Sequence, residues 1–490
     1  MGFDNPPERR FSGAAQGWLG AADRERKQAT MTVMDETRAP VLAAPRPPQQ
    51  RMSLRQFLRA VRDSSIATFP AEAYEKDIVA RKLLWRRTFI VNEPQAIKHI
   101  LLDNAANYVR ADIARRLLEP GLGRGLLTSE GERWRKHRRI MAPSFDHRSI
   151  LGYAPIMTEI ASALADQWDR LPEAAELDVA AAMMHATLHI ISRAMFSSDS
   201  DDIVDTVEYG VAGYQNSVRP GLLDLLGAPD WLARLASPKR GRGFLSDFDK
   251  AIDRLLAARG HAGDAQPKDL LARLIAARDE ETGGGMTAQE VRDQVVTIFM
   301  AGHETTALAL TWTWYLLSQH PAAEARLHAE LDAVLAGRPA RHEDLARLPY
   351  ARMVIEESMR LYPPAHTISR QAIGDDAVLG HRIPAGSAVL IAPWLLHRKP
   401  AIWENPERFD PQRFSPERSA ARHRFAYIPF GAGPRICIGM AFAMTEAVLI
   451  LATIAQRYRL RLKAGHPVEP QGLITLRPRY GMRMNLLPRH

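Results

Sequence analysis

The sequence FGAGPRICIG, at residues 430–439, is the most informative stretch of the chain. It contains Cys437, the single cysteine among 490 residues, in a glycine-rich loop that leads into an apolar, helically spaced segment from about Met440. Free N–H groups and the positive dipole end at a helix start favour a thiolate. Gly433 and Gly439 permit tight turns and close approach. A lone cysteine is most often an inert core residue, but this loop favours a thiolate metal ligand beside a flat group.

Composition places the chain among globular proteins. It is 46% hydrophobic and 25% charged, and no run of about 18 apolar residues is present, so no membrane span is expected. A single cysteine excludes an internal disulfide and favours a reducing, cytoplasmic compartment. Lys and Arg exceed Asp and Glu by 65 − 56 = 9. No zinc-ligand spacing, basic heptad or RNA-binding motif accompanies this charge, so nucleic-acid binding is not expected.

The chain divides into two regions by composition. Residues 1–50 are rich in Pro, Ala, Arg and Gln, which predicts a mostly disordered N-terminal tail. Residues 51–490 are periodic and predict a single large, mainly α-helical domain with small peripheral β-sheets, of the α+β class. Strand-like runs occur at 83–91 and 377–395, and residues 380–386 supply hairpin turn chemistry.

A long helix is the second informative segment. Thr287 and Glu290 form a capping-box pattern, and apolar residues then continue at helical spacing until Pro321. About 33 residues at 1.5 Å per residue predict a helix of roughly 50 Å. Its centre, AGHETT at residues 301–306, contains one Gly and two Thr, which have low helix propensity. Something other than helix stability therefore favours these residues.

With both segments in view, the chain resembles the cytochrome P450 family of haem-thiolate monooxygenases over about residues 51–490. The cysteine loop matches the family signature Phe-x-x-Gly-x-Arg-x-Cys-x-Gly, and the long helix matches the oxygen-activation segment. Glu357 and Arg360 match the Glu-x-x-Arg motif, and a later motif makes Arg413 the third member of the buried charge triad. Four motifs in the family's order are far more specific than one. The resemblance implies a cytochrome P450 fold around a buried haem b (iron protoporphyrin IX).

The resemblance also implies roles for individual residues. Cys437 would be the metal ligand, an axial thiolate whose electron donation to iron favours O–O cleavage. Phe430 would shield that ligand, although an ordinary core aromatic explains it equally well. For the basic residues, a solvated helix face is the alternative. The cofactor-binding residues implied are Trp134, Arg138, Ala301, Arg370, Phe430, Gly433, Arg435, Cys437 and Gly439, of which Trp134, Arg138, Arg370 and Arg435 match positions that contact haem propionates.

Glu304 and Thr305 are the catalytic residues that the resemblance implies. Ala301 and Thr305 are i,i+4 neighbours on one helix face, where small residues leave room for O2. Thr305 would hydrogen-bond the oxygen being activated, and Glu304 would connect it to a proton supply. A helical threonine also bonds back to the carbonyl four residues earlier, and the two roles are compatible. Thr306 is the alternative, but the family places the catalytic hydroxyl directly after the acid.

Substrate and electron donor are less closely determined. By analogy, residues 108–127, Ile298, 365–369 and 473–475 would line the pocket, and their mainly apolar character favours a hydrophobic small molecule. The chain ends about 50 residues after Cys437 and has no cysteines for an iron–sulfur cluster. Electrons are therefore expected from an external ferredoxin or flavodoxin with its reductase. The basic residues expected on its docking face are Arg135, Lys136 and Arg139.

Two other functions are compatible with a haem-thiolate protein. A peroxygenase would use H2O2 directly, but peroxide already carries the protons that a relay through Glu304 and Thr305 delivers. A sensor or carrier without turnover would not need that relay. The expected function is therefore O2-dependent hydroxylation or epoxidation of a hydrophobic organic molecule.

Overall fold

The computed structural model describes residues 42–45, 47–48, 52–83, 86–197, 213, 250, 252–254 and 269–489. The chain forms two compact units, Met1–Leu42 and Ala43–His490. The predicted tail at residues 1–50 lies outside the described residues except at 42–45 and 47–48. Part of the predicted helical region, between residues 198 and 268, lies outside them apart from a few positions. The described residues from 43 onward belong to the unit Ala43–His490.

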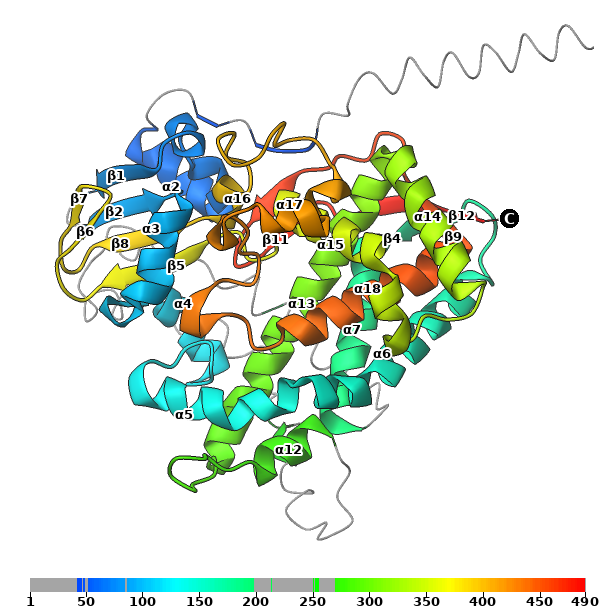
Figure 1. The fold of residues 1–490 in the computed structure, drawn as a ribbon, viewed down its shortest axis with the longest axis horizontal. Coiled ribbons are helices and arrows are strands. Elements are labelled where there is room, and N and C mark those ends of the chain that lie inside the picture. Colours follow the sequence, from blue (N-terminus) through cyan, green and yellow to red (C-terminus); the bar gives the residue numbers. More distant parts are fainter. Residues whose placement is uncertain are drawn as a thin grey trace, which may run out of the picture. The chain divides into compact units, whose positions relative to one another are not determined.

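Helices dominate the described part of this unit, and small sheets accompany them (Figure 1), as the sequence predicts. The α-helices are α2 Leu54–Asp63, α3 Pro94–Lys98, α4 Asp112–Leu122, α5 Gly131–Met141, α6 His147–Trp168, α7 Val179–Phe196, α12 Leu270–Ala276, α13 Ala288–Gln319, α14 Pro321–Leu335, α15 Pro349–Leu361, α16 Pro393–Leu396, α17 Pro416–Ala420 and α18 Met440–Arg457. Short 3-10 or π turns include η1 Ser65–Thr68, η2 Ala71–Tyr74, η3 His99–Asp103, η7 His342–Arg347, η8 Pro411–Phe414 and η10 Gly433–Arg435.

Among the described residues, the strands form one five-stranded sheet and three smaller ones. The largest has the order β1-β2-β8-β5-β3, in which β2 and β8 are parallel and the other neighbours are antiparallel. The predicted run at 83–91 contains β2, and the run at 377–395 contains most of β6, β7 and β8. Gly380, with a φ of +77°, lies in the β6–β7 turn. The strands are β1 Ile78–Leu83, β2 Arg86–Val91, β3 Tyr108–Arg110, β4 Glu176–Asp178, β5 Ile368–Ala372, β6 Asp376–Val378, β7 His381–Ile383, β8 Ala388–Ile391, β9 Tyr458–Leu462, β10 Pro470–Gly472, β11 Leu476–Pro478 and β12 Arg483–Pro488.

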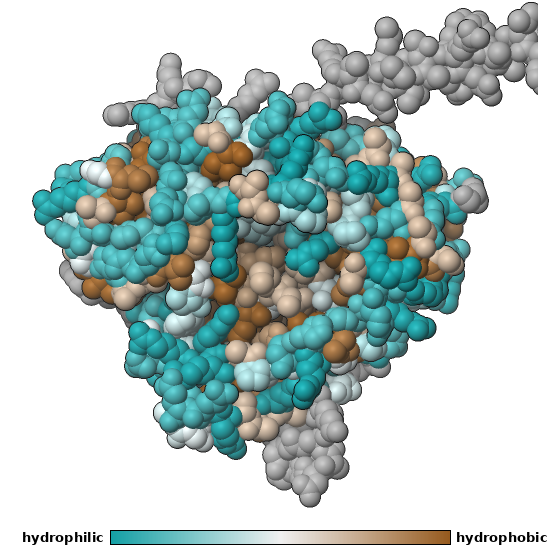
Figure 2. Space-filling view, viewed as in Figure 1, coloured by the Kyte–Doolittle hydropathy of each residue, from teal (hydrophilic) through white to brown (hydrophobic). Residues whose placement is uncertain are grey.

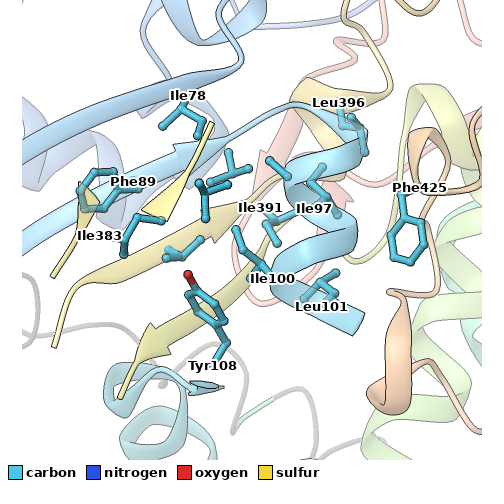
Figure 3. Close-up of a cluster of buried hydrophobic side chains, with 14 of the residues drawn as sticks. Ile78, Phe89, Ile97, Ile100, Leu101, Tyr108, Ile383, Ile391, Leu396 and Phe425 are labelled. Carbon is cyan, nitrogen blue, oxygen red and sulfur yellow. The ribbon is translucent and has the colours of Figure 1, made fainter. Parts of the chain in front are cut away.

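A buried apolar cluster joins the large sheet to α3 and the π turn η3 that follows it (Figure 3). Ile97, Ile100 and Leu101 of this helical segment belong to the same cluster as Ile391 of β8. Phe425 belongs to the same cluster and comes from the chain shortly before the cysteine loop. Burial of these side chains, at about 25 cal/mol per Å² of apolar surface, fixes the backbone of η3 against which the cysteine loop packs.

Helix α13 confirms the predicted long helix. The Thr287 hydroxyl accepts from the Glu290 N–H, and the Glu290 carboxylate accepts from the Thr287 N–H, which completes the capping box. The helix ends at Gln319, before Pro321, and its 32 residues span about 48 Å. Most of its side chains are buried, and α7, α15 and α18 pack against it. Helix α13 is therefore the central element of the helical part.

In the part of the chain that the structure describes, two helices, α7 and α18, are long and apolar enough to cross a membrane, which the sequence analysis did not anticipate. In each, 61% of the apolar window is buried inside the protein, and core helices of globular domains pass the same test. Helix α7 packs against α6 and α13, and α18 packs against α6, α13 and α15. This packing accounts for their apolar composition.

The predicted buried charge triad is assembled. Glu357 and Arg360 on α15 are fully buried and form two hydrogen bonds, of 2.6 and 2.8 Å. The Arg413 Nε lies 3.4 Å from the Glu357 carboxylate. Arg360 also donates to three backbone carbonyls between residues 397 and 408. These bonds satisfy charges that would be costly to bury alone, and they fasten α15 to the segment that leads to the cysteine loop.

Candidate active site

The cysteine loop is shaped by backbone contacts. The Cys437 N–H donates to the Phe430 carbonyl at 2.9 Å. Gly433 has a φ of +71°, and a Cβ at this position would lie 1.8 Å from the Leu101 carbonyl oxygen. Only glycine fits there, where the loop crosses η3. Gly439 differs from the expectation, because its φ is −88° and no atom lies within 4 Å of where its Cβ would be, so sterics do not require glycine.

The Cys437 thiol combines accessible surface with a desolvated environment. Burial raises its pKa, while the Gly439 N–H and the Arg138 guanidinium lower it. The N–H group at the helix start lowers the pKa of the thiol as expected, but desolvation raises it by more. The net pKa of Cys437 is raised, so the predicted lowering is wrong. A bound metal ion would favour ionisation of this thiol.

Helix α5 presents the predicted basic face to the cysteine loop. Arg138 donates to the Ile436 carbonyl at 2.8 Å. The Arg435 guanidinium lies over the Trp134 ring, 4.4 Å from its centroid, in a cation–π arrangement. Arg435 also pairs with Glu130, the residue immediately before α5. Trp134 and Arg138, one turn apart, thus contact consecutive residues of the loop.

Three arginines form what we call the guanidinium cluster: Arg110, Arg370 and Arg435. Arg110 on β3 and Arg370 on β5 are directly opposite each other in the sheet. Burial, followed by repulsion from the other two guanidiniums, lowers the pKa of Arg110 to about 9. Burial and repulsion from Arg435 lower the pKa of Arg370 to about 10. Glu130 offsets one of the three positive charges, so the formal charge of the group is 3 − 1 = +2.

This cluster fits the two carboxylates of a haem. Like charges opposite each other in a sheet are destabilising, and a buried polar group without a partner adds to the cost. Within the described part of the chain, the Arg110 Nε is buried and has no hydrogen-bond partner. Two propionates would balance the charge and accept charge-assisted hydrogen bonds. The sequence analysis missed Arg110, because a lone arginine carries no signal until strand pairing places it opposite Arg370.

The centre of α13 has an accessible side. Ala301 and Thr305 retain solvent-accessible surface, whereas most residues around them are buried. The Thr305 hydroxyl donates to the Ala301 carbonyl at 2.8 Å, which is the back-bonded arrangement expected of a helical threonine. Thr306 is buried and donates to Glu446 of α18. Thr305, and not Thr306, therefore reaches the accessible side of the helix.

Glu304 lies on a different side of α13 and is only 3% exposed. The Thr475 hydroxyl donates to its Oε1 at 2.8 Å, and the Arg477 guanidinium lies 3.4 Å from the same oxygen. Thr475 immediately precedes β11, and Arg477 belongs to it. The structure thus holds the predicted proton-relay acid against the C-terminal part of the chain.

A groove with a volume of about 550 Å³ lies beside the cysteine loop. Its lining is mainly apolar and includes the exposed side chains of Leu102 and Met440, with Arg352 and Arg424 among the polar residues. Figure 2 shows hydrophobic side chains gathered in a hollow near the middle of this face. Phe430 also lines the groove.

The three basic residues expected on a docking face make different contacts within the protein. Arg135 forms an exposed ion pair within α5, and Lys136 lies 3.9 Å from Glu290. Arg139 instead makes hydrogen bonds of 2.9 and 3.0 Å to the carboxylate of Asp279, whose side chain is fully buried. Arg139 therefore anchors α5 to the segment before α13, which differs from the expected role.

Comparison with known proteins identifies the family. The family model for cytochrome P450 matches residues 45–483. Cyclooctatin synthase from Streptomyces melanosporofaciens is 38% identical, over 84% of this chain and 88% of its own length. Cyclooctat-9-en-7-ol 5-monooxygenase from the same organism is 34% identical, over 81% and 84% respectively. The crystal structure of the cytochrome P450DA heme domain aligns with a TM-score of 0.78 and 27% identity, covering 92% of this chain and 99% of that one. The chain therefore belongs to the cytochrome P450 family, as a haem-thiolate monooxygenase that uses O2 and an external electron donor.

Proposed function

We propose that Cys437 ligates the haem iron and that the guanidinium cluster binds the two haem propionates. The observation that carries this assignment is a guanidinium cluster with a net charge of +2 and an unpartnered buried Nε, in which Arg435 comes from the same loop as the desolvated thiol. Arg138, whose charge favours the Cys437 thiolate, stabilises the ligand. When bound, the haem supplies the redox chemistry that splits O2 and transfers one oxygen atom.

Other predicted residues shape the space around the cofactor. The Trp134 ring packs against the Arg435 guanidinium, and Gly433 lets the loop pack tightly on η3. The Gly439 N–H points at the Cys437 sulfur, and such hydrogen bonds tune a metal-bound thiolate. On α13, the small, accessible side chain of Ala301 would leave room for the cofactor and O2.

Thr305 and Glu304 form the proposed proton relay. Insertion of one oxygen atom from O2 releases the other as water and consumes two electrons and two protons. Thr305 holds a proton at Oγ1 on the accessible side of α13. Glu304 supplies the next proton once its carboxyl group turns toward Thr305. A relay of this kind is needed with O2 and not with H2O2, which favours a monooxygenase over a peroxygenase.

The proposed substrate is a largely apolar organic molecule. The name of one relative denotes a cyclic alkenol as its substrate. In this chain, Ile298 on α13 and the exposed Ile474 lie at positions predicted to line the pocket. Apolar contacts of this kind gain free energy in proportion to the area that they remove from water. Hydroxylation or epoxidation of an alkene or alkenol is the proposed reaction.

The proposed electron donor is an acidic ferredoxin or flavodoxin that docks at the groove beside the cysteine loop. Leu102 and Met440 offer apolar contact there, and Arg352 and Arg424 offer positive charge. Raising the ionic strength should slow reduction, because salt screens such attraction. A reduction rate independent of salt would contradict this donor type. We place the enzyme in the cytoplasm, where its thiol stays reduced.

The spectrum of the reduced, carbon monoxide-bound protein tests the ligand assignment. The wild-type protein should show the red-shifted Soret band of thiolate ligation. Cys437→Ser should lose it, while Met440→Leu, three residues away, should retain it. Absence of the band from well-folded wild-type protein would refute the assignment. A screen of alkenes and alkenols for spin-state shifts would then identify the substrate class.

A further inference from the structure

Two histidines lie one helical turn apart on the accessible face of α7. The Nε2 atoms of His185 and His189 are 3.0 Å apart, and the centroids of their rings are separated by 4.2 Å. His185 is exposed and His189 is half-buried, so solvent reaches the pair. Residues at i and i+4 share one face of a helix, and in helical zinc sites this spacing brings two imidazoles to one metal ion. The proposed oxygenase chemistry gives this pair no role.

The separation of the two nitrogens matches the one that a metal ion requires. Two N–H groups that face each other at 3.0 Å would repel, so at least one Nε2 presents a lone pair. Metal bonds to imidazole nitrogen are about 2.0–2.1 Å long, so a 90° angle between them places the nitrogens about 2.9–3.0 Å apart. A tetrahedral angle would require roughly 3.3–3.4 Å. The pair therefore suits the 90° angles of tetragonal Cu2+ or Ni2+ better than tetrahedral Zn2+.

The surroundings of the pair leave room for further ligands. Ala181, one turn before His185, is exposed and small, so water molecules can complete the coordination. Arg193, one turn after His189, carries a charge that would repel a cation, but it is paired with Glu159 of α6 at 3.0 Å. Within the described ranges, no group of three or more His, Cys, Asp or Glu side chains is placed to hold a metal ion. The site therefore has two protein ligands, and two histidines alone lack the four-ligand spacing that marks structural zinc modules in a sequence.

We propose that His185 and His189 bind one divalent transition-metal ion, with Cu2+ preferred and water molecules as the remaining ligands. The general order of affinities among these metals also favours Cu2+. The bound ion closes a ring across one turn of α7. The same turn contains Thr187, whose hydroxyl donates to the His303 carbonyl at the centre of α13 at 3.0 Å. The ion thus stiffens the part of α7 that is attached to the centre of α13.

Equilibrium dialysis of the untagged holoenzyme against CuSO4 measures this binding. Wild type should bind one Cu2+, and His185→Asn and His189→Asn should each weaken the binding by roughly tenfold or more, since even the partners of metal ligands contribute that much. His381→Asn removes an exposed histidine of β7 and is the matched control, which should bind Cu2+ like wild type. The double variant Ala181→His with His189→Asn restores an i,i+4 pair one turn earlier and should regain the site.

Hydrogen–deuterium exchange gives a second measurement. With free Cu2+ at 100 times its Kd, the turn from His185 to His189 should open roughly 100-fold less often in wild type, because the ion binds only the helical form. His185→Asn should show no such protection.

Two outcomes would overturn the proposal. Equal Cu2+ binding by wild type, His185→Asn and His381→Asn would show an adventitious ion only, and the same holds for protection of α7 that persists in His185→Asn. Tighter binding of Zn2+ than of Cu2+ would contradict the assigned geometry. The red-shifted Soret band of the carbon monoxide complex, retained in each variant, shows that a loss of Cu2+ binding does not come from misfolding.

Discussion

Replacing Arg110 with methionine tests whether the guanidinium cluster exists to bind an anionic cofactor. Methionine keeps a long apolar stem and removes the charge. In haem-free protein the change should be stabilising, because it removes one of two like charges that face each other on β3 and β5. Like charges that lie directly opposite each other on neighbouring strands are destabilising. Haem-free Arg110→Met should therefore unfold at a higher urea concentration than wild type.

Haem binding should change in the opposite direction. A charge-assisted hydrogen bond is worth about 1.5–3 kcal/mol, and 1.36 kcal/mol corresponds to a factor of ten. Loss of the Arg110 contact should therefore speed haem dissociation by roughly 10- to 150-fold. The rate is measured by transfer of haem from the holoenzyme to excess apomyoglobin. Arg81→Met, on the edge strand β1 in an exposed ion pair, is the matched control and should dissociate at the wild-type rate.

The pH dependence follows from the lowered pKa of Arg110, about 9 in the folded protein. The ordinary pKa is 12.5, so between these values the unfolded chain binds more protons than the folded one. The stability of haem-free wild type, relative to Arg110→Met, should then rise as the pH increases through about 9. Urea unfolding of both proteins at several pH values measures the difference. If haem-free Arg110→Met is no more stable than wild type, and the holoenzyme variant releases haem no faster, the assignment of the guanidinium cluster to the haem propionates is refuted.

Three further substitutions have defined outcomes. Glu357→Gln leaves two arginines without their buried carboxylate and should lower the free energy of unfolding in urea by about 3–5 kcal/mol. Arg352→Gln, at an exposed pair on the same helix, should lower it by about 0.5 kcal/mol or less. Similar losses of stability in the two variants would contradict the triad's role. Gly433→Ala should abolish haem incorporation, because the new Cβ clashes with a backbone carbonyl. Gly431→Ala has nearly the same φ, but its nearest atom lies at 3.9 Å, so it should retain haem. Equal haem content in the two variants would show that the clash does not prevent haem incorporation. His366 is buried, which lowers its pKa to about 4 from 6.5, so the unfolded chain takes up a proton first as the pH falls. The free energy of unfolding should drop by about 3 kcal/mol between pH 6.5 and 4. His366→Gln should remove this pH dependence. If the pH dependence of stability is unchanged in His366→Gln, other residues cause the sensitivity to acid.

Local features of the structure were predictable from the sequence. The bounds of α13 follow from a capping box at one end and a proline at the other, both of which act on neighbouring residues. The cysteine loop was recognisable because its ligand, glycines and following helix lie within a few residues. The mainly helical fold with small sheets was likewise confirmed, since amphipathic spacing and turn residues are read from short windows.

Features that depend on distant contacts were not predictable. Arg110 joins the site only because β3 pairs with β5, and no spacing in the sequence reports that register. Glu446 is an acid within an apolar helix, and burial raises its pKa to about 8, although a hydrogen bond from Thr306 opposes this. The pKa of Cys437 was predicted to fall, because the helix start is visible in the sequence and the surrounding desolvation is not.

The bond from the Thr305 hydroxyl to the Ala301 carbonyl affects how α13 can deform. A carbonyl that already has a side-chain donor can lose its backbone donor without becoming an unsatisfied acceptor. Thr297, Thr311 and Thr313 make the same kind of bond elsewhere along the helix. The helix can therefore widen locally at its centre, at a cost of about one backbone hydrogen bond, or roughly 1 kcal/mol. Its capped and packed ends would keep their register, so a local widening of this kind would not require the helix to unfold.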